Sequence, residues 1–78
     1  MNSNKSTNQS SNYHALIQRD GRWWIGWVAE IPGVNGQGRT RPALMTNLRS
    51  ALKEALEINR QEAIEAAGES YEEVSFSP

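Results

Sequence analysis

The spacing of apolar residues changes at Thr40, and this change constrains the fold more than any other feature of the chain. Before Thr40, apolar residues alternate with polar ones, which is typical of half-buried β-strands. After Thr40, they recur every three or four residues, as on one face of an α-helix. The sequence therefore predicts a strand region followed by one long helix, which is an α+β domain.

Three strands are expected before the helix. The first covers 13–19 and the second covers 22–30, and the Asp20-Gly21 pair between them is a strong signal for a hairpin turn. Pro32-Gly33 ends the second strand because proline lacks a backbone donor. Residues 34–38 leave room for a short third strand, which its two glycines weaken.

The helix has clear start and stop signals. Thr40 is a good N-cap, and Pro42 is tolerated in the first turn, where its missing N–H has no partner to lose. Gly68 stops the helix after Ala67. Residues 72–76 then alternate like a last strand. The expected architecture is a β-β-β-α-β two-layer sandwich, in which one helix packs on a small antiparallel sheet.

In such a sandwich, the most buried side chains should be those that face the opposite layer. Strand side chains alternate between the two sheet faces, whereas helix side chains share a face every three or four residues. On this basis, the expected core residues are Ile17, Ile25, Trp27, Leu48, Leu52 and Ala55.

Composition narrows the class of protein. The chain has 78 residues, which is enough for one domain, and we expect that domain over 13–78. Residues 1–12 have no apolar side chain after Met1, so we expect them to be a disordered tail. No apolar run is long enough for a membrane span, and no secretory signal is visible. With no cysteine, a small cytoplasmic protein is the expectation.

The sequence offers little for catalysis, so we expect no enzyme, no metal site and no cofactor. His14 is the only histidine, and a lone strand histidine is more often a surface or packing residue than a ligand. Asp20 and Glu30 are better explained as a turn former and an exposed strand charge than as metal ligands. The Gly-rich stretch 36–40 lacks the Lys-Ser/Thr pair of a phosphate-binding loop.

Charge and tryptophan content point instead to a protein partner. Residues 1–41 hold five basic and two acidic residues, whereas residues 42–78 hold three basic and seven acidic ones. The acidic end is either a solvated surface or a patch for a basic partner. Three tryptophans in one strand exceed what so small a core needs, and tryptophan is enriched at interface hot spots. The candidate partner-binding residues are Trp23, Trp24, Glu69, Glu72 and Glu73.

Several short motifs, in this order and spacing, resemble the HicB antitoxin family. They are the tyrosine-led stretch 13–17, the Asp20-Gly21 turn, the aromatic stretch 24–33 that ends in Pro-Gly, the Gln-Gly-Arg-Thr of 37–40 and the Asn-Leu-Arg-Ser-Ala of 47–51. The resemblance covers about 13–60 and departs from the family at Ala43 and Val34, where the family often has Glu and Cys.

The resemblance implies a truncated ribonuclease H-like fold without its catalytic carboxylates. It also implies that the chain inhibits a small basic HicA-type ribonuclease toxin by direct contact, as an antitoxin or an orphan relative. Many HicB proteins carry a DNA-binding domain after this fold, and we expect none here. We also expect a homodimer or a higher homo-oligomer, because about 66 residues build only a small core.

Two alternatives remain open at this point. The chain is either such an inhibitor, or a small nucleic-acid-binding or homo-oligomeric scaffold module without a toxin partner. The formal net charge of −1 disfavours direct nucleic-acid binding, because phosphate contacts need a basic surface.

Overall fold

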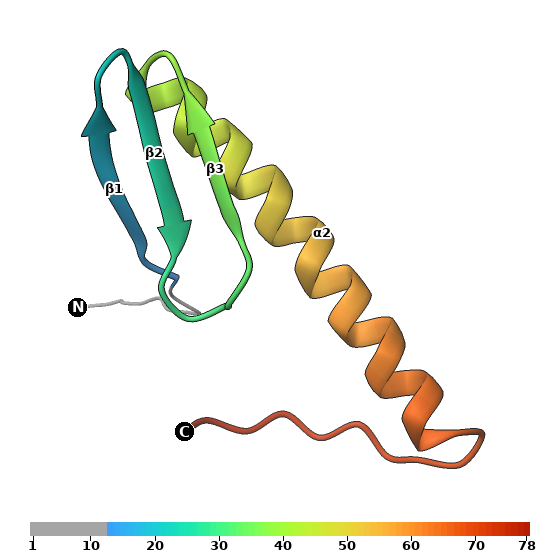
Figure 1. Ribbon diagram of the computed structural model, residues 1–78. Coiled ribbons are helices and arrows are strands. Elements are labelled where there is room, and N and C mark those ends of the chain that lie inside the picture. The colour runs from blue at the N-terminus through green and yellow to red at the C-terminus, as the bar shows by residue number, and fades with distance from the viewer. Residues whose placement is uncertain (1–12) are drawn as a thin grey trace.

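In the computed structural model, which describes residues 13–78, three strands precede one long helix (Figure 1). The elements are β1 (Ala15–Asp20), β2 (Trp23–Val28), β3 (Asn35–Gly38) and α2 (Arg41–Ala67). The α+β class and the order β-β-β-α are confirmed. The tail expected over residues 1–12 lies outside the described residues.

The three strands form one antiparallel sheet in the order β1-β2-β3. Asp20 pairs with Trp23, so Gly21 and Arg22 make the connection between β1 and β2. The turn is therefore centred one residue later than the Asp20-Gly21 pair suggested. Gly21 has φ +64, a conformation that glycine adopts without steric cost and that other residues rarely adopt.

The pairing register sorts the side chains between two faces of the sheet. Ile17 pairs with Gly26, and Gly26 pairs with Gly36, so these three residues share the face toward α2. A Cβ atom added at Gly26 would lie 3.4 Å from a methyl group of Leu44. Glycine in β2 and β3 therefore lets the helix approach the sheet backbone closely.

A small core lies between this face and the first half of α2. Its buried members come from β2, the β2–β3 loop and two turns of the helix. They are Val28, Val34, Leu44 and Leu48.

The expected core list is only partly right. Leu48 is buried, but Ile17, Ile25, Leu52 and Ala55 are half-buried. Trp27 and Ile25 were assigned to the wrong face. Trp27 pairs with Leu16 and Asn35, and Ile25 pairs with Gln18 and Gln37, on the side away from α2. The helix instead packs on the face of β2 that carries Gly26 and Val28, where small side chains admit it.

Both ends of α2 match their sequence signals. The Thr40 hydroxyl accepts a hydrogen bond from the Ala43 N–H at 3.1 Å, as expected of an N-cap. At the other end, Gly68 has φ +82, and its N–H donates to the carbonyl of Ile64 at 3.1 Å. Within residues 13–78, no helix has the length and apolar character that a membrane span requires.

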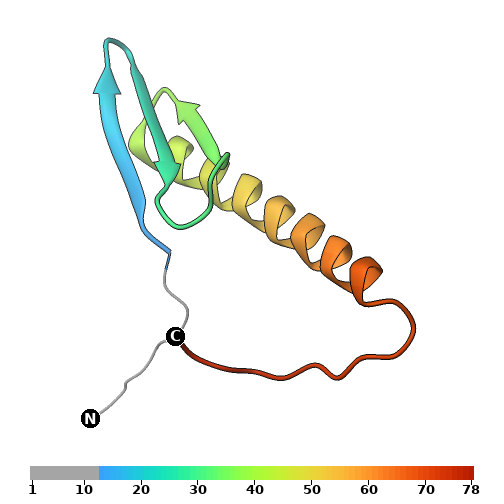
Figure 2. The ribbon, with the colours of Figure 1, turned by 60° about the horizontal axis from the view of Figure 1, so that its bottom comes forward.

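The helix is much longer than the sheet that it covers. Its 27 residues span about 40 Å at the usual rise, whereas the six-residue strands span only about 20 Å. The second half of α2 therefore projects beyond the sheet (Figures 1 and 2). The radius of gyration of 16.0 Å exceeds the roughly 11 Å of a compact chain of this length.

The strand expected over 72–76 is absent, which corrects the β-β-β-α-β order. Residues 69–78 contain neither helix nor strand, and all of them are exposed. The projecting half of α2 carries the chain past the end of the sheet before it can turn back. The returning segment crosses below the sheet and does not run beside a strand (Figures 1 and 2).

Candidate protein-interaction surface

The face of the sheet opposite α2 is uncovered, and we call it the open face. No other element among residues 13–78 packs on it. Its side chains come from alternate positions of all three strands. They are Leu16, Gln18, Asp20, Trp23, Ile25, Trp27, Asn35 and Gln37.

Large apolar side chains dominate the centre of the open face. Leu16 and Trp27 form a cross-strand pair and are 48% and 39% exposed. Trp23 is 38% exposed at the hairpin end of the same face. Contiguous exposed apolar area of this kind marks surfaces that bind a partner.

The two tryptophans singled out from the sequence lie on opposite faces. Trp23 is on the open face, where the Arg39 guanidinium lies 4.8 Å from its ring centroid. Trp24 is half-buried on the helix side, and Arg19 lies 5.2 Å from its ring. Of the two, only Trp23 can anchor a partner on the open face. Trp24 belongs to the packing around the core.

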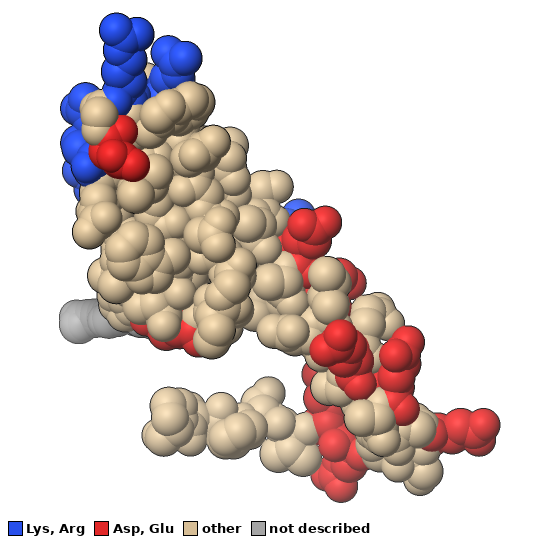
Figure 3. Space-filling model, viewed as in Figure 1, with Lys and Arg blue, Asp and Glu red and all other residues tan. Residues whose placement is uncertain are grey.

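Charge separates along the molecule, as Figure 3 shows. Lys and Arg gather at the hairpin end of the sheet, and most Asp and Glu lie along the far half of α2 and the segment after it. The basic end contains Arg19 and Arg22 from the hairpin, Arg39 from the β3–α2 connection and Arg41 from the first turn of α2. The surface between these two ends carries few charges in this view.

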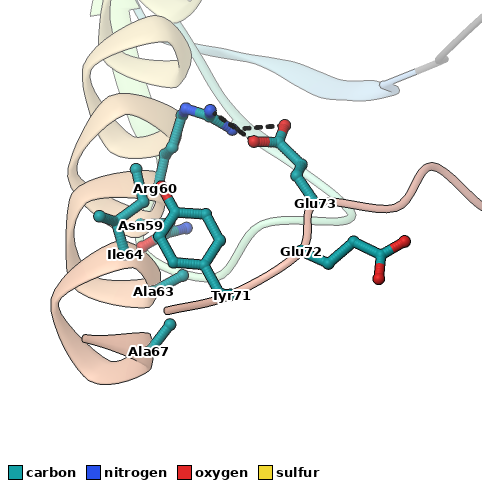
Figure 4. Close-up of a pocket in the computed structure, with 8 residues that line it drawn as sticks. All are labelled: Asn59, Arg60, Ala63, Ile64, Ala67, Tyr71, Glu72 and Glu73. Carbon is teal, nitrogen blue, oxygen red and sulfur yellow. Dashed lines mark hydrogen bonds and ion pairs between the residues drawn. The ribbon is translucent and has the colours of Figure 1, made fainter. Parts of the chain in front are cut away.

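The three candidate glutamates all lie beyond α2, at the end of the molecule remote from Trp23. Among residues 13–78, Glu69 and Glu72 have no ion-pair partner, whereas both Glu73 oxygens accept hydrogen bonds from the Arg60 guanidinium, at 3.0 and 3.2 Å (Figure 4). The structure therefore does not bring the predicted tryptophans and glutamates together in one site. The acidic cluster is a separate surface.

The Arg60–Glu73 pair holds the segment after α2 against the helix. Between α2 and this segment lies a hollow of about 460 Å³, in which the ring of Tyr71 lies beside Ala63 and Ile64 (Figure 4). The hydrogen bonds from Arg60, together with its positive charge, lower the pKa of Glu73. The pair is fully formed above the ordinary glutamate pKa and is lost as the pH falls through the lowered pKa of Glu73.

Removing the Arg60 guanidinium should return the pKa of Glu73 to the ordinary range for glutamate. In the Arg60→Gln variant, we expect the pKa of Glu73 to rise toward the ordinary value for glutamate, because the hydrogen bonds and positive charge that lower it are removed. Carboxyl NMR titration measures this change directly. Lys53→Gln, which removes a positive charge elsewhere on α2, is the control and should leave the Glu73 titration where it was. Equal titration curves in all three proteins would contradict the pairing.

His14 and Glu30 form a second exposed pair, with a structural role. The Glu30 carboxylate accepts a hydrogen bond from the His14 backbone N–H at 2.8 Å and also contacts Nδ1 of the ring. These contacts lower the pKa of Glu30, with the backbone hydrogen bond as the largest cause. They connect the residue before β1 to the turn that follows β2. Within residues 13–78, no group of three or more metal-ligating side chains is present.

Sequence reasoning missed the centre of the open face. It placed Trp27 and Ile25 in the core and did not select Leu16. The pairing of Gly26 with Gly36 is the signal that could have identified the open-face residues. Gly26 and Gly36 mark the face that a helix approaches, so the other face of β2, with its two tryptophans, must be the open one.

The comparisons with known proteins identify no relative. The chain matches no protein-family model, and the comparisons find no match among the curated proteins or the solved structures.

Proposed function

We propose that this protein is an HicB-like antitoxin, or an orphan relative, that inhibits a small HicA-type ribonuclease toxin by protein–protein contact through the open face. The observation that carries the proposal is the uncovered apolar centre of that face, formed by Leu16, Trp23 and Trp27. The order and spacing of the HicB-like motifs supply the class of partner. The proposal assigns no catalysis and no cofactor to the chain.

The open face has the features of a protein-binding surface. Tryptophan buries about 150–250 Å² when it is covered, so Trp23 and Trp27 offer two large anchors. Polar Gln18, Asn35 and Gln37 surround the apolar centre and can hydrogen-bond a partner at the rim. An apolar centre with a polar rim is the usual anatomy of a protein interface.

The acidic end has a different role in this proposal. Glu69 and Glu72 follow the far end of α2, beyond the sheet, so they act on a basic toxin at long range and do not contact the same site as the tryptophans. Charges at such positions raise the association rate and make it depend on salt. The lifetime of the complex rests on the apolar anchors.

Truncation of Trp27 is the direct test of the proposal. Against a purified HicA-type toxin encoded beside this chain, Trp27→Ala should weaken binding about 30-fold or more, as expected for a hot-spot tryptophan. Most of the loss should be in the dissociation rate. Surface-immobilised binding kinetics measure both, and toxin-catalysed RNA cleavage reports inhibition.

The matched control is Ile58→Ala, which removes an exposed apolar side chain from α2, on the other side of the molecule. It should bind and inhibit as wild type does. Equal binding by wild type and Trp27→Ala would rule out the open face as the inhibitory surface. Failure of the wild-type chain to bind or inhibit the toxin would rule out the antitoxin function itself.

A second function is favoured by one observation, the cluster of arginines beside an exposed tryptophan. Arg39 stacks on Trp23, and Arg22 lies in the adjacent hairpin turn. Aromatic rings and arginines together bind single-stranded nucleic acid by stacking and charge. A salt titration with fluorescent single-stranded RNA separates the two functions, because absence of binding at low salt excludes this one.

A further inference from the structure

The core is unfilled on one side, next to β1. Helix α2 packs on β2 and β3 far more than on β1. A hollow of about 180 Å³ therefore remains beneath β1, open to solvent and mostly apolar. Its lining includes Tyr13, Ala15, Val28, Met45, Leu48 and Leu52.

The outer edge of β1 is also free to pair. The Ala29 N–H donates to the carbonyl of His14, which fixes the alternation of hydrogen bonds between β1 and β2. The backbone groups of Ala15 and Ile17 therefore point away from β2, toward an edge on which no strand lies among residues 13–78. The opposite edge, at β3, is partly occupied, because the Asn47 amide donates to the carbonyl of Gln37.

The segment 72–76 has the pattern of the missing strand. Val74 and Phe76 fall on the same side when the backbone is extended, and they are 65% and 90% exposed. These are the kinds of side chain that would fill the hollow beneath β1. Glu72 and Glu73 precede them, and Arg49 at the rim of the hollow offers an opposite charge.

The segment does not occupy this site in its own chain, because α2 carries it beyond the core. Ala55 is the last helix residue that packs against the core, and α2 continues for 12 more residues, or about 18 Å. Glu73 is still at the level of Arg60, to which it is paired. The residues after it pass below the end of the sheet (Figure 2).

We propose that segment 72–76 of a second copy of this chain pairs with the outer edge of β1 and places Val74 and Phe76 over the hollow. The exchange is reciprocal, so two copies form a symmetric dimer in which each completes the sheet of the other. The exposed Arg60–Glu73 pair opens to release the segment, so this pair and the titration that tests it belong to the monomer. The open face is not used, so this assembly does not depend on the antitoxin function.

Sedimentation of the full chain at tens of micromolar tests the dimer. Wild type should sediment at twice the 8.7 kDa protomer mass. The double variant Val74→Asp/Phe76→Asp should sediment as a monomer, since charges cannot enter the hollow. The control Ser75→Asp/Ser77→Asp puts the same charges on the opposite side of the segment and should remain dimeric. A monomeric wild type, or a dimeric Val74→Asp/Phe76→Asp variant, would overturn the proposal.

Cross-linking identifies the strand that receives the segment, since the chain has no native cysteine. A tagged Ser75→Cys chain is mixed and refolded with an untagged Gln18→Cys chain, which carries its thiol on β1. A short thiol cross-linker should join tagged to untagged protein. The partner Gln37→Cys, on β3, should give no such product. Cross-linking to β3 alone would overturn the assignment to β1.

Discussion

Leu44→Ala is expected to unfold much of the protein at 25 °C. Leu44 is 0% exposed, and it packs between the first turn of α2 and the sheet, next to Gly26. Truncating a fully buried leucine costs about 2–5 kcal/mol, because the lost burial adds to the cavity that remains. The core of a domain this small supplies only about 3–5 kcal/mol, so the substitution removes most of the stability.

Urea unfolding followed by tryptophan fluorescence, at one fixed protein concentration, measures this loss. The control is Leu16→Ala, the same chemical change on the open face, where the leucine is half exposed. It should cost about 1 kcal/mol or less, in proportion to the area that it buries. Equal unfolding midpoints for the Leu44→Ala and Leu16→Ala variants would show that the core is not where the structure has it.

Gly38→Ala is expected to have the second largest effect. A Cβ atom at Gly38 would lie 2.6 Å from the backbone nitrogen of Leu44 and 3.0 Å from the carbonyl carbon of Ala43. The obstructing atoms belong to the backbone, so no side-chain rotation relieves the clash, and the start of α2 must move from the sheet. Overpacking of this kind costs about 1–3 kcal/mol, and the rigid surroundings favour the upper end.

Thermal melting by circular dichroism checks the Gly38→Ala result. Gln37→Ala is the control, because Gln37 is the neighbouring residue of β3 but points to the open face. A roughly 3 kcal/mol loss should lower the melting temperature of a domain this size by 10 °C or more, whereas the control should change little. Two equal melting curves would contradict the close approach of α2 to β3.

The elements of the fold were largely predictable because their signals are local. The alternation in β1 and β2, the Thr40 cap and the stop at Gly68 each depend on a few neighbouring residues. The face of β2 was not predictable in the same way, because both faces carry a tryptophan. The face on which the helix packs depends on where three glycines leave room for it. Their positions on a common face become known only when the strands are aligned.

The remaining wrong predictions concern tertiary structure, that is, where segments lie relative to one another. The alternation over 72–76 is a valid strand pattern, but pattern alone says nothing about whether the segment can reach an edge. Whether the segment lies beside an edge strand depends on the length of α2, because the helix ends beyond the sheet. Likewise, sequence selected Trp23 and Glu69 as candidate contacts but could not indicate that they lie at opposite ends of the molecule.

The projecting half of α2 also has a consequence for how the molecule opens. The first turn of the helix contains no acidic residue and the last turn no basic one, so its charges do not favour the helix dipole. Beyond Ala55, the helix has no sheet beneath it, and isolated helices of this length are marginal in water. Backbone amides near Leu44 should therefore exchange with solvent deuterium only on global unfolding, whereas those after Arg60 exchange by local fraying. One continuous helix thus contains two levels of protection, and the boundary between them lies where the sheet ends.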